Sequence, residues 1–108
     1  MSFIDIGALP VIERKPGWHG RYFNSPSMTF ARYDFEAGAE IPEHSHVQEE
    51  VWQVLEGELE IMVAGVATRA KAGWAGIVPP DTLHSVRAVT DGKAIVVDTP
   101  IRDMTQGA

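Results

Sequence analysis

Three histidines and a glutamate have the spacing of a metal site. His44 and His46 lie two residues apart, and such residues point to the same face of an extended strand, so both imidazoles can reach one point. Glu50 follows after a short turn, and His84 follows a turn that contains two prolines. Three imidazoles and one carboxylate suit a single divalent metal, which could be Fe, Mn, Ni, Cu or Zn. Four protein ligands on a six-coordinate metal leave two open positions, which catalysis at a metal requires.

Asp98 is the candidate for a proton-transferring residue. It ends the predicted strand 93–98 on the same face as Ala94 and Val96. A carboxyl group among apolar neighbours has a raised pKa and can act as a general acid or base. The alternative interpretations are a solvated strand end and a salt bridge to Arg102.

Three more residues are candidates for the pocket around the metal. Trp52 lies in phase with Glu50 on the same predicted strand and can form a wall of the cavity, although a plain core position is the alternative. Gln48 is close in sequence to the ligands. Arg102 follows Asp98 shortly after the last predicted strand.

The spacing of turn signals predicts an all-β protein. Turn signals recur roughly every eight to twelve residues, and the segments between them are rich in Val, Ile, Thr and aromatic residues, which is typical of a sandwich or barrel. Gly57 and Gly65 stand between apolar runs and predict a three-stranded meander. Strands are expected over residues 21–24, 28–36, 41–46, 49–56, 58–64, 66–70, 76–78, 84–89 and 93–98, with little or no helix.

Length and composition indicate one soluble domain. The chain has 108 residues, of which 44% are hydrophobic, and no apolar stretch approaches the roughly 18 residues of a membrane helix. We therefore expect a cytoplasmic protein with an N-terminal arm over 1–20, a barrel over 21–100 and a mobile tail over 101–108. The absence of cysteine excludes disulfides and thiolate metal sites. A net charge of −6 argues against nucleic acid or an anionic membrane as the main partner.

The strand expected over 49–56 predicts a partner chain. Val51 and Leu55 lie on one of its faces, whereas Trp52 and Val54 lie on the other, so the strand is apolar on both faces. A single barrel leaves one of these faces uncovered, and a second copy of the chain would cover it. We therefore expect a homodimer.

The motifs resemble those of the cupin superfamily, in particular its small single-domain members. The first cupin motif, G-x5-H-x-H-x3-E-x6-G, is matched in full by Gly38, His44, His46, Glu50 and Gly57. The second, G-x5-P-x-G-x2-H-x3-N, is matched by Gly73, Pro79 and His84, with Asp81 in place of the second glycine and Ala88 in place of the asparagine. The resemblance implies an antiparallel jelly-roll β-barrel, usually dimeric, that binds metal through residues 44, 46, 50 and 84.

A weaker resemblance links the segments 38–50 and 98–103 to the pectin-degradation cupins that open unsaturated uronate rings. Those proteins usually carry glutamine at the position of Glu50. They also carry an acid two residues before the position of Asp98, where this chain has Val96.

Three functions are consistent with this set of residues. The first is a metal-dependent enzyme that performs acid–base chemistry, of the isomerase or lyase type, on a small oxygen-rich acid or sugar acid. The second is an Fe(II)-dependent dioxygenase, and the third is a non-catalytic module that binds a small molecule or a metal. A Ser-His-Asp hydrolase is disfavoured, because neither Ser45 nor Ser85 sits in a nucleophile-elbow context.

Overall fold

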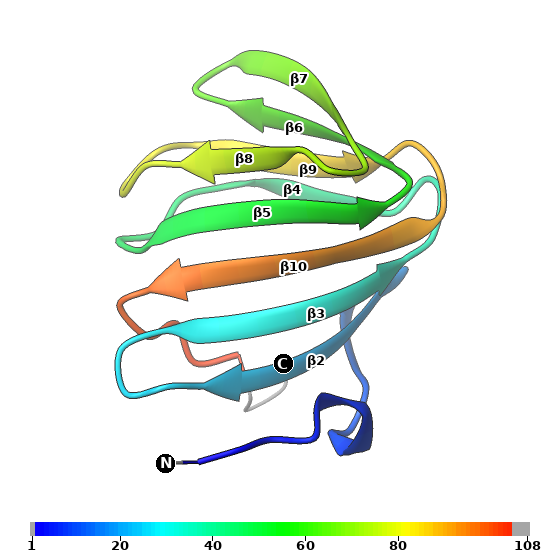
Figure 1. The fold of residues 1–108 in the computed structure, drawn as a ribbon. Coiled ribbons are helices and arrows are strands. Elements are labelled where there is room, and N and C mark those ends of the chain that lie inside the picture. Colours follow the sequence, from blue (N-terminus) through cyan, green and yellow to red (C-terminus); the bar gives the residue numbers. More distant parts are fainter. Residues whose placement is uncertain (1, 105–108) are drawn as a thin grey trace.

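Ten strands form two antiparallel sheets in the computed structural model, which describes residues 2–104 (Figure 1). The strands are β1 (Ile12–Lys15), β2 (Trp18–Asn24), β3 (Thr29–Phe35), β4 (Glu40–His44), β5 (Glu49–Glu56), β6 (Glu58–Val63), β7 (Val66–Lys71), β8 (Ala75–Val78), β9 (His84–Ala88) and β10 (Gly92–Thr99). One sheet has the order β1-β2-β3-β10-β5-β8 and the other the order β4-β9-β6-β7. A short 3-10 helix, η1 (Ile6–Ala8), precedes them, and the described residues include no helix long and apolar enough to cross a membrane.

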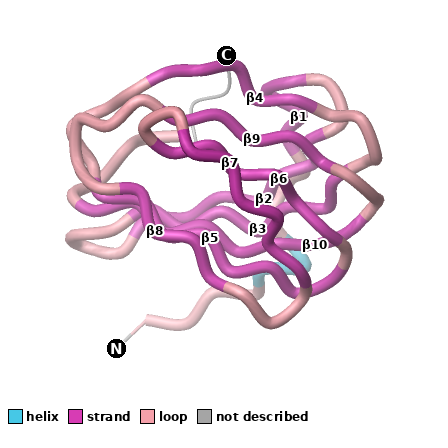
Figure 2. Tube along the Cα trace, turned by 90° about the horizontal axis from the view of Figure 1, so that it is seen from above, coloured by secondary structure: helices cyan, strands magenta, loops and turns pink. Residues whose placement is uncertain are grey.

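The core lies between the two sheets, which curve around a common interior when seen from above (Figure 2). Alternation along β6 buries Leu59 and Ile61 and leaves Glu58 and Glu60 partly exposed, as the sequence predicts. Edge-to-face and stacked contacts join four buried aromatic rings on the large sheet: Trp18, Tyr33, Phe35 and Trp52. The predicted all-β, antiparallel jelly-roll barrel is thus confirmed.

The barrel begins earlier than predicted, because much of the expected N-terminal arm is sheet. Residues 12–15 form β1, and β2 starts at Trp18, which is 1% exposed, rather than at Arg21. Gly17 has a φ of +85° and lets the chain turn tightly, so that Ile12 pairs with Gly20. The arm is therefore limited to the residues before β1.

Residues 101–104 of the predicted mobile tail are bound to the barrel. The backbone nitrogen of Arg102 donates a hydrogen bond to Thr29 Oγ1 at 2.9 Å. The Gln48 side-chain amide donates to the Ile101 carbonyl at 3.1 Å, and Arg14 Nη1 donates to the Met104 carbonyl at 3.3 Å. Met104 also packs against the core. This part of the tail is a fixed strap, whereas residues 105–108 of the predicted tail lie outside the described residues.

The outer face of the large sheet carries exposed apolar side chains. Val51 on β5 pairs with Ile77 on β8, and Ile77 is 65% exposed. Trp74, directly before β8, is 52% exposed. The homodimer expected from the two apolar faces of β5 stays a prediction.

The first testable prediction concerns the tight turn at Gly57, between β5 and β6. Gly57 has a φ of +80°, and a Cβ there would lie 3.0 Å from Gly92 Cα and closer still to the Asp91 carbonyl oxygen. Gly65 has the same φ of +80° but open space around it. Gly65→Ala should lower the free energy of unfolding by about 1 kcal/mol, because a residue with a Cβ is strained in this left-handed backbone conformation. Gly57→Ala should lower the free energy of unfolding by about 3 kcal/mol, because the new Cβ would also clash with the neighbouring backbone.

Urea unfolding of both variants checks this prediction. Equal midpoints for Gly57→Ala and Gly65→Ala would contradict it, since the two residues share a backbone conformation and differ only in their surroundings.

Candidate metal centre

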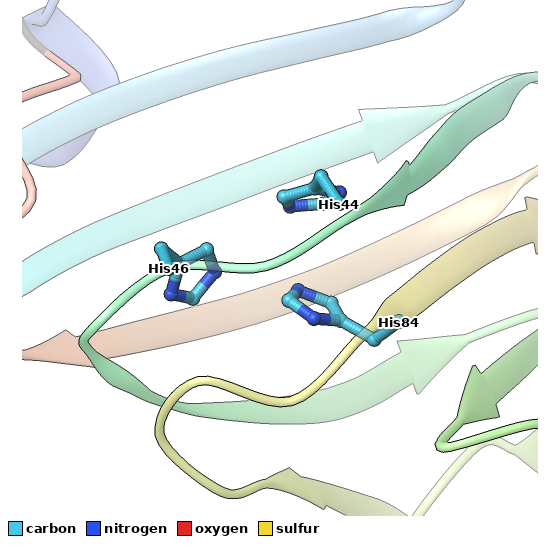
Figure 3. Close-up of side chains that lie close together, drawn as sticks. All are labelled: His44, His46 and His84. Atoms are coloured by element: carbon cyan, nitrogen blue, oxygen red, sulfur yellow. The ribbon is translucent and has the colours of Figure 1, made fainter.

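The three histidines predicted as ligands converge in the structure, and Figure 3 shows their rings close together. His44 ends β4, His46 lies in the following turn, and His84 begins β9. Because β4 pairs with β9, His44 and His84 are direct cross-strand neighbours. Their ring centroids are 4.3 Å apart, and the ring of His46 lies 4.9 Å from that of His84. Each residue offers one ligand nitrogen within 4.8 Å of the others.

Backbone carbonyl groups fix the orientation of all three rings. Nδ1 of His44 lies 2.8 Å from the Pro42 carbonyl oxygen, and Nδ1 of His84 lies 2.8 Å from that of Thr82. Nδ1 of His46 lies 3.1 Å from the Gln48 carbonyl oxygen. Since a carbonyl oxygen only accepts, each Nδ1 must carry the proton and donate it. In the neutral ring, Nε2 then presents a lone pair, which is the form that binds a metal.

The Nε2 atoms show that the site fits a metal ion. Those of His46 and His84 are buried, and in rings protonated at Nδ1 neither Nε2 lone pair has a hydrogen-bond donor among the described residues. Burial also lowers the pKa values of His44 and His46, which favours the neutral, metal-binding form of both rings. A buried polar atom without a partner is costly, and a shared cation would satisfy several of them together. The donor set suits a divalent transition metal without selecting one.

Glu50, the fourth predicted ligand, lies beside the imidazoles and is 3% exposed. Its Oε2 is 3.2 Å from His84 Nε2, and its Oε1 is 3.4 Å from His46 Nε2. Burial raises the pKa of Glu50, but contacts with His84, Asp98 and Trp52 outweigh burial and lower that pKa to about 2. Burial lowers the pKa of His84, and the contact with Glu50 outweighs it and raises that pKa. A cation bound by the imidazoles would balance the negative charge of Glu50.

Trp52 holds the Glu50 carboxylate in place. Its indole Nε1 donates to Glu50 Oε2 at 2.7 Å, and its ring stacks on Tyr33 with centroids 5.9 Å apart. The other carboxylate oxygen, Oε1, accepts a hydrogen bond from Arg102 Nη1 at 3.4 Å. Both oxygens of Glu50 are therefore oriented by neighbours outside the group of histidines.

Asp98 lies next to this centre, because β10 pairs with β5 and places Asp98 opposite Glu50. It is 2% exposed, so the strand end is not solvated. Its Oδ2 is 3.8 Å from Arg102 Nη1, which is the salt bridge named above as an alternative. Its Oδ1 is buried without a hydrogen-bond partner among the described residues. Burial, followed by the negative charge of Glu50, raises the pKa of Asp98 to about 8.

A cavity of about 430 Å³ opens onto the centre. His44, Glu50 and Asp98 line it, together with Trp52 and Arg102, which the sequence places in the pocket. Gln48, also predicted for the pocket, does not line the cavity and instead binds the strap through Ile101. Its side chain reaches the chain end because residues 101–104 fold back, which local sequence patterns do not reveal. Lining residues that the sequence analysis did not single out include Arg14, Trp18, Tyr22, Tyr33 and Met104.

The fourth histidine lies elsewhere. His19 is half-exposed on β2, where Nε2 is 3.1 Å from Glu36 Oε2 and Nδ1 is 3.9 Å from Glu13 Oε1. This group is separate from His44, His46 and His84 and makes His19 a useful control.

Fold and site together define a small jelly-roll barrel with an internal three-histidine site suited to a divalent metal. The family described as "Cupin domain" matches residues 31–100, and the chain belongs to that family. No curated protein matches the sequence in a direct comparison.

Solved structures with a similar fold match nearly the whole chain. An RmlC-like cupin from Shewanella frigidimarina is 26% identical with a TM-score of 0.88, covering 95% of this chain and 94% of that one. KdgF from Halomonas sp. is 24% identical with a TM-score of 0.89, covering 97% and 98%. A predicted oxalate decarboxylase from Thermotoga maritima is 18% identical with a TM-score of 0.78, covering 93% and 100%. The last two likenesses concern the fold alone.

The second prediction tests the histidine set. His44→Ala removes a half-buried ring and should lower the bound metal from about one ion per chain to a small fraction of that, because two imidazoles and a carboxylate hold divalent metals more weakly. Elemental analysis after reconstitution and gel filtration measures the content. His19→Ala is the matched control and should keep the metal. Equal metal content in the two variants would refute the assignment.

The third prediction concerns Trp52. Trp52→Phe keeps an aromatic ring but removes the donor to Glu50 Oε2, so metal affinity should fall about tenfold. Trp74→Phe alters an exposed indole and should leave the affinity unchanged. Competition against a chromogenic chelator gives both dissociation constants, and identical values would show that the indole does not position Glu50.

Proposed function

We propose that the chain is a metal-dependent enzyme that performs acid–base chemistry, of the isomerase or lyase type, on a small oxygen-rich acid such as a sugar acid. One observation carries this proposal. His44 of the convergent histidine site lines the same cavity as the buried carboxyl group of Asp98, whose Oδ1 has no hydrogen-bond partner among the described residues. A Lewis-acid site beside a proton-transferring group is the arrangement that such reactions use.

The protein's own residues divide the work as follows. A metal bound by the histidines would polarise a carbonyl or hydroxyl oxygen of the substrate. With its pKa raised to about 8, Asp98 holds a proton near neutral pH; it can donate this proton to one substrate atom and take one from a neighbouring atom, so that the reaction is balanced without an oxidant. Arg102 lies within 3.4 Å of Glu50 and 3.8 Å of Asp98 and keeps these two carboxyl groups together in one buried site. Aromatic side chains, among them Tyr33 and Trp52, line the cavity in which the transfer takes place.

The resemblance of two segments to the uronate-opening cupins supports sugar acids as the substrate class. KdgF has nearly the same length and fold, and the segments 38–50 and 98–103 resemble the uronate-opening cupins. Two positions differ, because this chain has Glu50 where those proteins usually have glutamine and Val96 where they have an acid. Asp98 lies on the same buried face of β10 as Val96 and takes over the acidic role in this proposal.

The fourth prediction tests Asp98. Protein loaded in turn with Mn, Fe, Ni or Zn is mixed with an unsaturated uronate, and the reaction is followed by NMR. Asp98→Asn should lower kcat about 100-fold, because it keeps the shape but cannot donate or accept the proton. Asp34→Asn, an exposed position on β3, is the control and should leave kcat unchanged.

The remaining outcomes separate the alternatives. Oxygen consumption with iron alone would favour the dioxygenase. Binding of the acid without turnover, retained in His46→Ala, would favour a non-catalytic module. Unchanged kcat in Asp98→Asn would remove the proposed role of that carboxyl group.

A further inference from the structure

Strand β1 carries a cation where inward-facing side chains are usually apolar. Its burial alternates, so that Ile12 and Arg14 face inward while Glu13 and Lys15 are exposed. Ile12 packs against the core, as expected for that face. Arg14 lies on the same face, is half-buried and lines the cavity of about 430 Å³. A half-buried guanidinium group has to be compensated.

The charge of Arg14 is not balanced within the described residues. Arg102, the other arginine of the cavity, reaches Glu50 and Asp98. Arg14 donates to the neutral carbonyl of Met104, and within residues 2–104 no ion pair links Arg14 or Lys15 to a carboxylate. This contrasts with the chain as a whole, whose net charge is −6. A half-buried cation at the cavity that has no ion pair among the described residues of an acidic protein indicates an anionic ligand.

Two tyrosine hydroxyl groups complete the surroundings. Tyr22 and Tyr33 line the same cavity, and the hydroxyl of Tyr22 donates to that of Tyr33 at 3.3 Å. One O–H of the pair is therefore free to donate to a ligand. Burial raises the pKa of Tyr22, and the positive charges of Arg14 and Arg102 act in the opposite direction, so both cations lie near this hydroxyl.

We propose that Arg14, with the tyrosine hydroxyl pair, binds the carboxylate of the substrate. This inference rests on the proposed function and narrows its substrate class. Arg14 comes from β1 and His44 from β4, and both line the same cavity. A substrate bound there would be a hydroxy or oxo acid whose carboxylate contacts Arg14 while another of its oxygens reacts at the metal.

The fifth prediction uses a matched pair of sugars as probes. Galacturonate and galactose differ in the carboxylate, and each is titrated into metal-loaded protein and followed by amide chemical shifts. The wild-type protein should bind galacturonate about tenfold more tightly than galactose. Arg14→Gln should remove this difference, whereas Arg32→Gln, on the outer face of β3, should keep it. Equal binding of the two sugars, no binding of galacturonate up to about 10 mM, or an unchanged preference in Arg14→Gln overturns the proposal.

The same variants separate this inference from the proposed function. The preference for galacturonate is also measured in His44→Ala, because binding can be followed in this variant even if it does not turn over any substrate. If galacturonate is preferred through Arg14 but no uronate is turned over, the proposed carboxylate site stands and the proposed enzymatic function is rejected. Turnover with a KM that does not change in Arg14→Gln would retain the enzyme and reject the carboxylate site.

Discussion

The site depends on three hydrogen bonds from imidazole rings to backbone carbonyl groups. Pro42, Gln48 and Thr82 each accept from a histidine Nδ1, at distances of 2.8 to 3.1 Å. Each acceptor lies two residues from its histidine, so the local chain path that creates the turn also selects the tautomer. The lone pairs of Nε2 are thereby directed inward, where two of these atoms have no hydrogen-bond partner among the described residues. The backbone therefore prepares the ligand geometry.

Electrostatic coupling extends this arrangement from the histidines to the cavity. Glu50 contacts two imidazoles on one side and the Trp52 indole and Arg102 on the other. Its negative charge is also one cause of the raised pKa of Asp98. A change in the charge of the metal centre therefore changes the pKa of Asp98, which lies directly across from Glu50 on the paired strand.

The sequence predicts the parts of this protein that are encoded locally. The strand of Glu50 was expected over 49–56 and occupies those residues, because the turn at Gly57 marks its end and the residues before it include an apolar run. The convergence of His44 and His46 was predicted from a strand over 41–46, but that strand ends at His44, and His46 reaches the site from the following turn. By contrast, β1 is short and lies between prolines, so its inward face becomes apparent only through pairing with β2. The role of Gln48 was missed for the same reason, since its partner Ile101 is distant in sequence.

The rim of the cavity is assembled from the two ends of the chain. Arg14 and the strap at 101–104 meet through the Met104 carbonyl, and both lie outside residues 31–100, the part that matches the family. The three histidines of the candidate metal centre lie inside that part. A new acid could thus be accommodated by altering terminal segments, while the strands that hold the imidazoles stay as they are. Such a division allows one chemical centre to be retained as substrate preference diverges among proteins of this architecture.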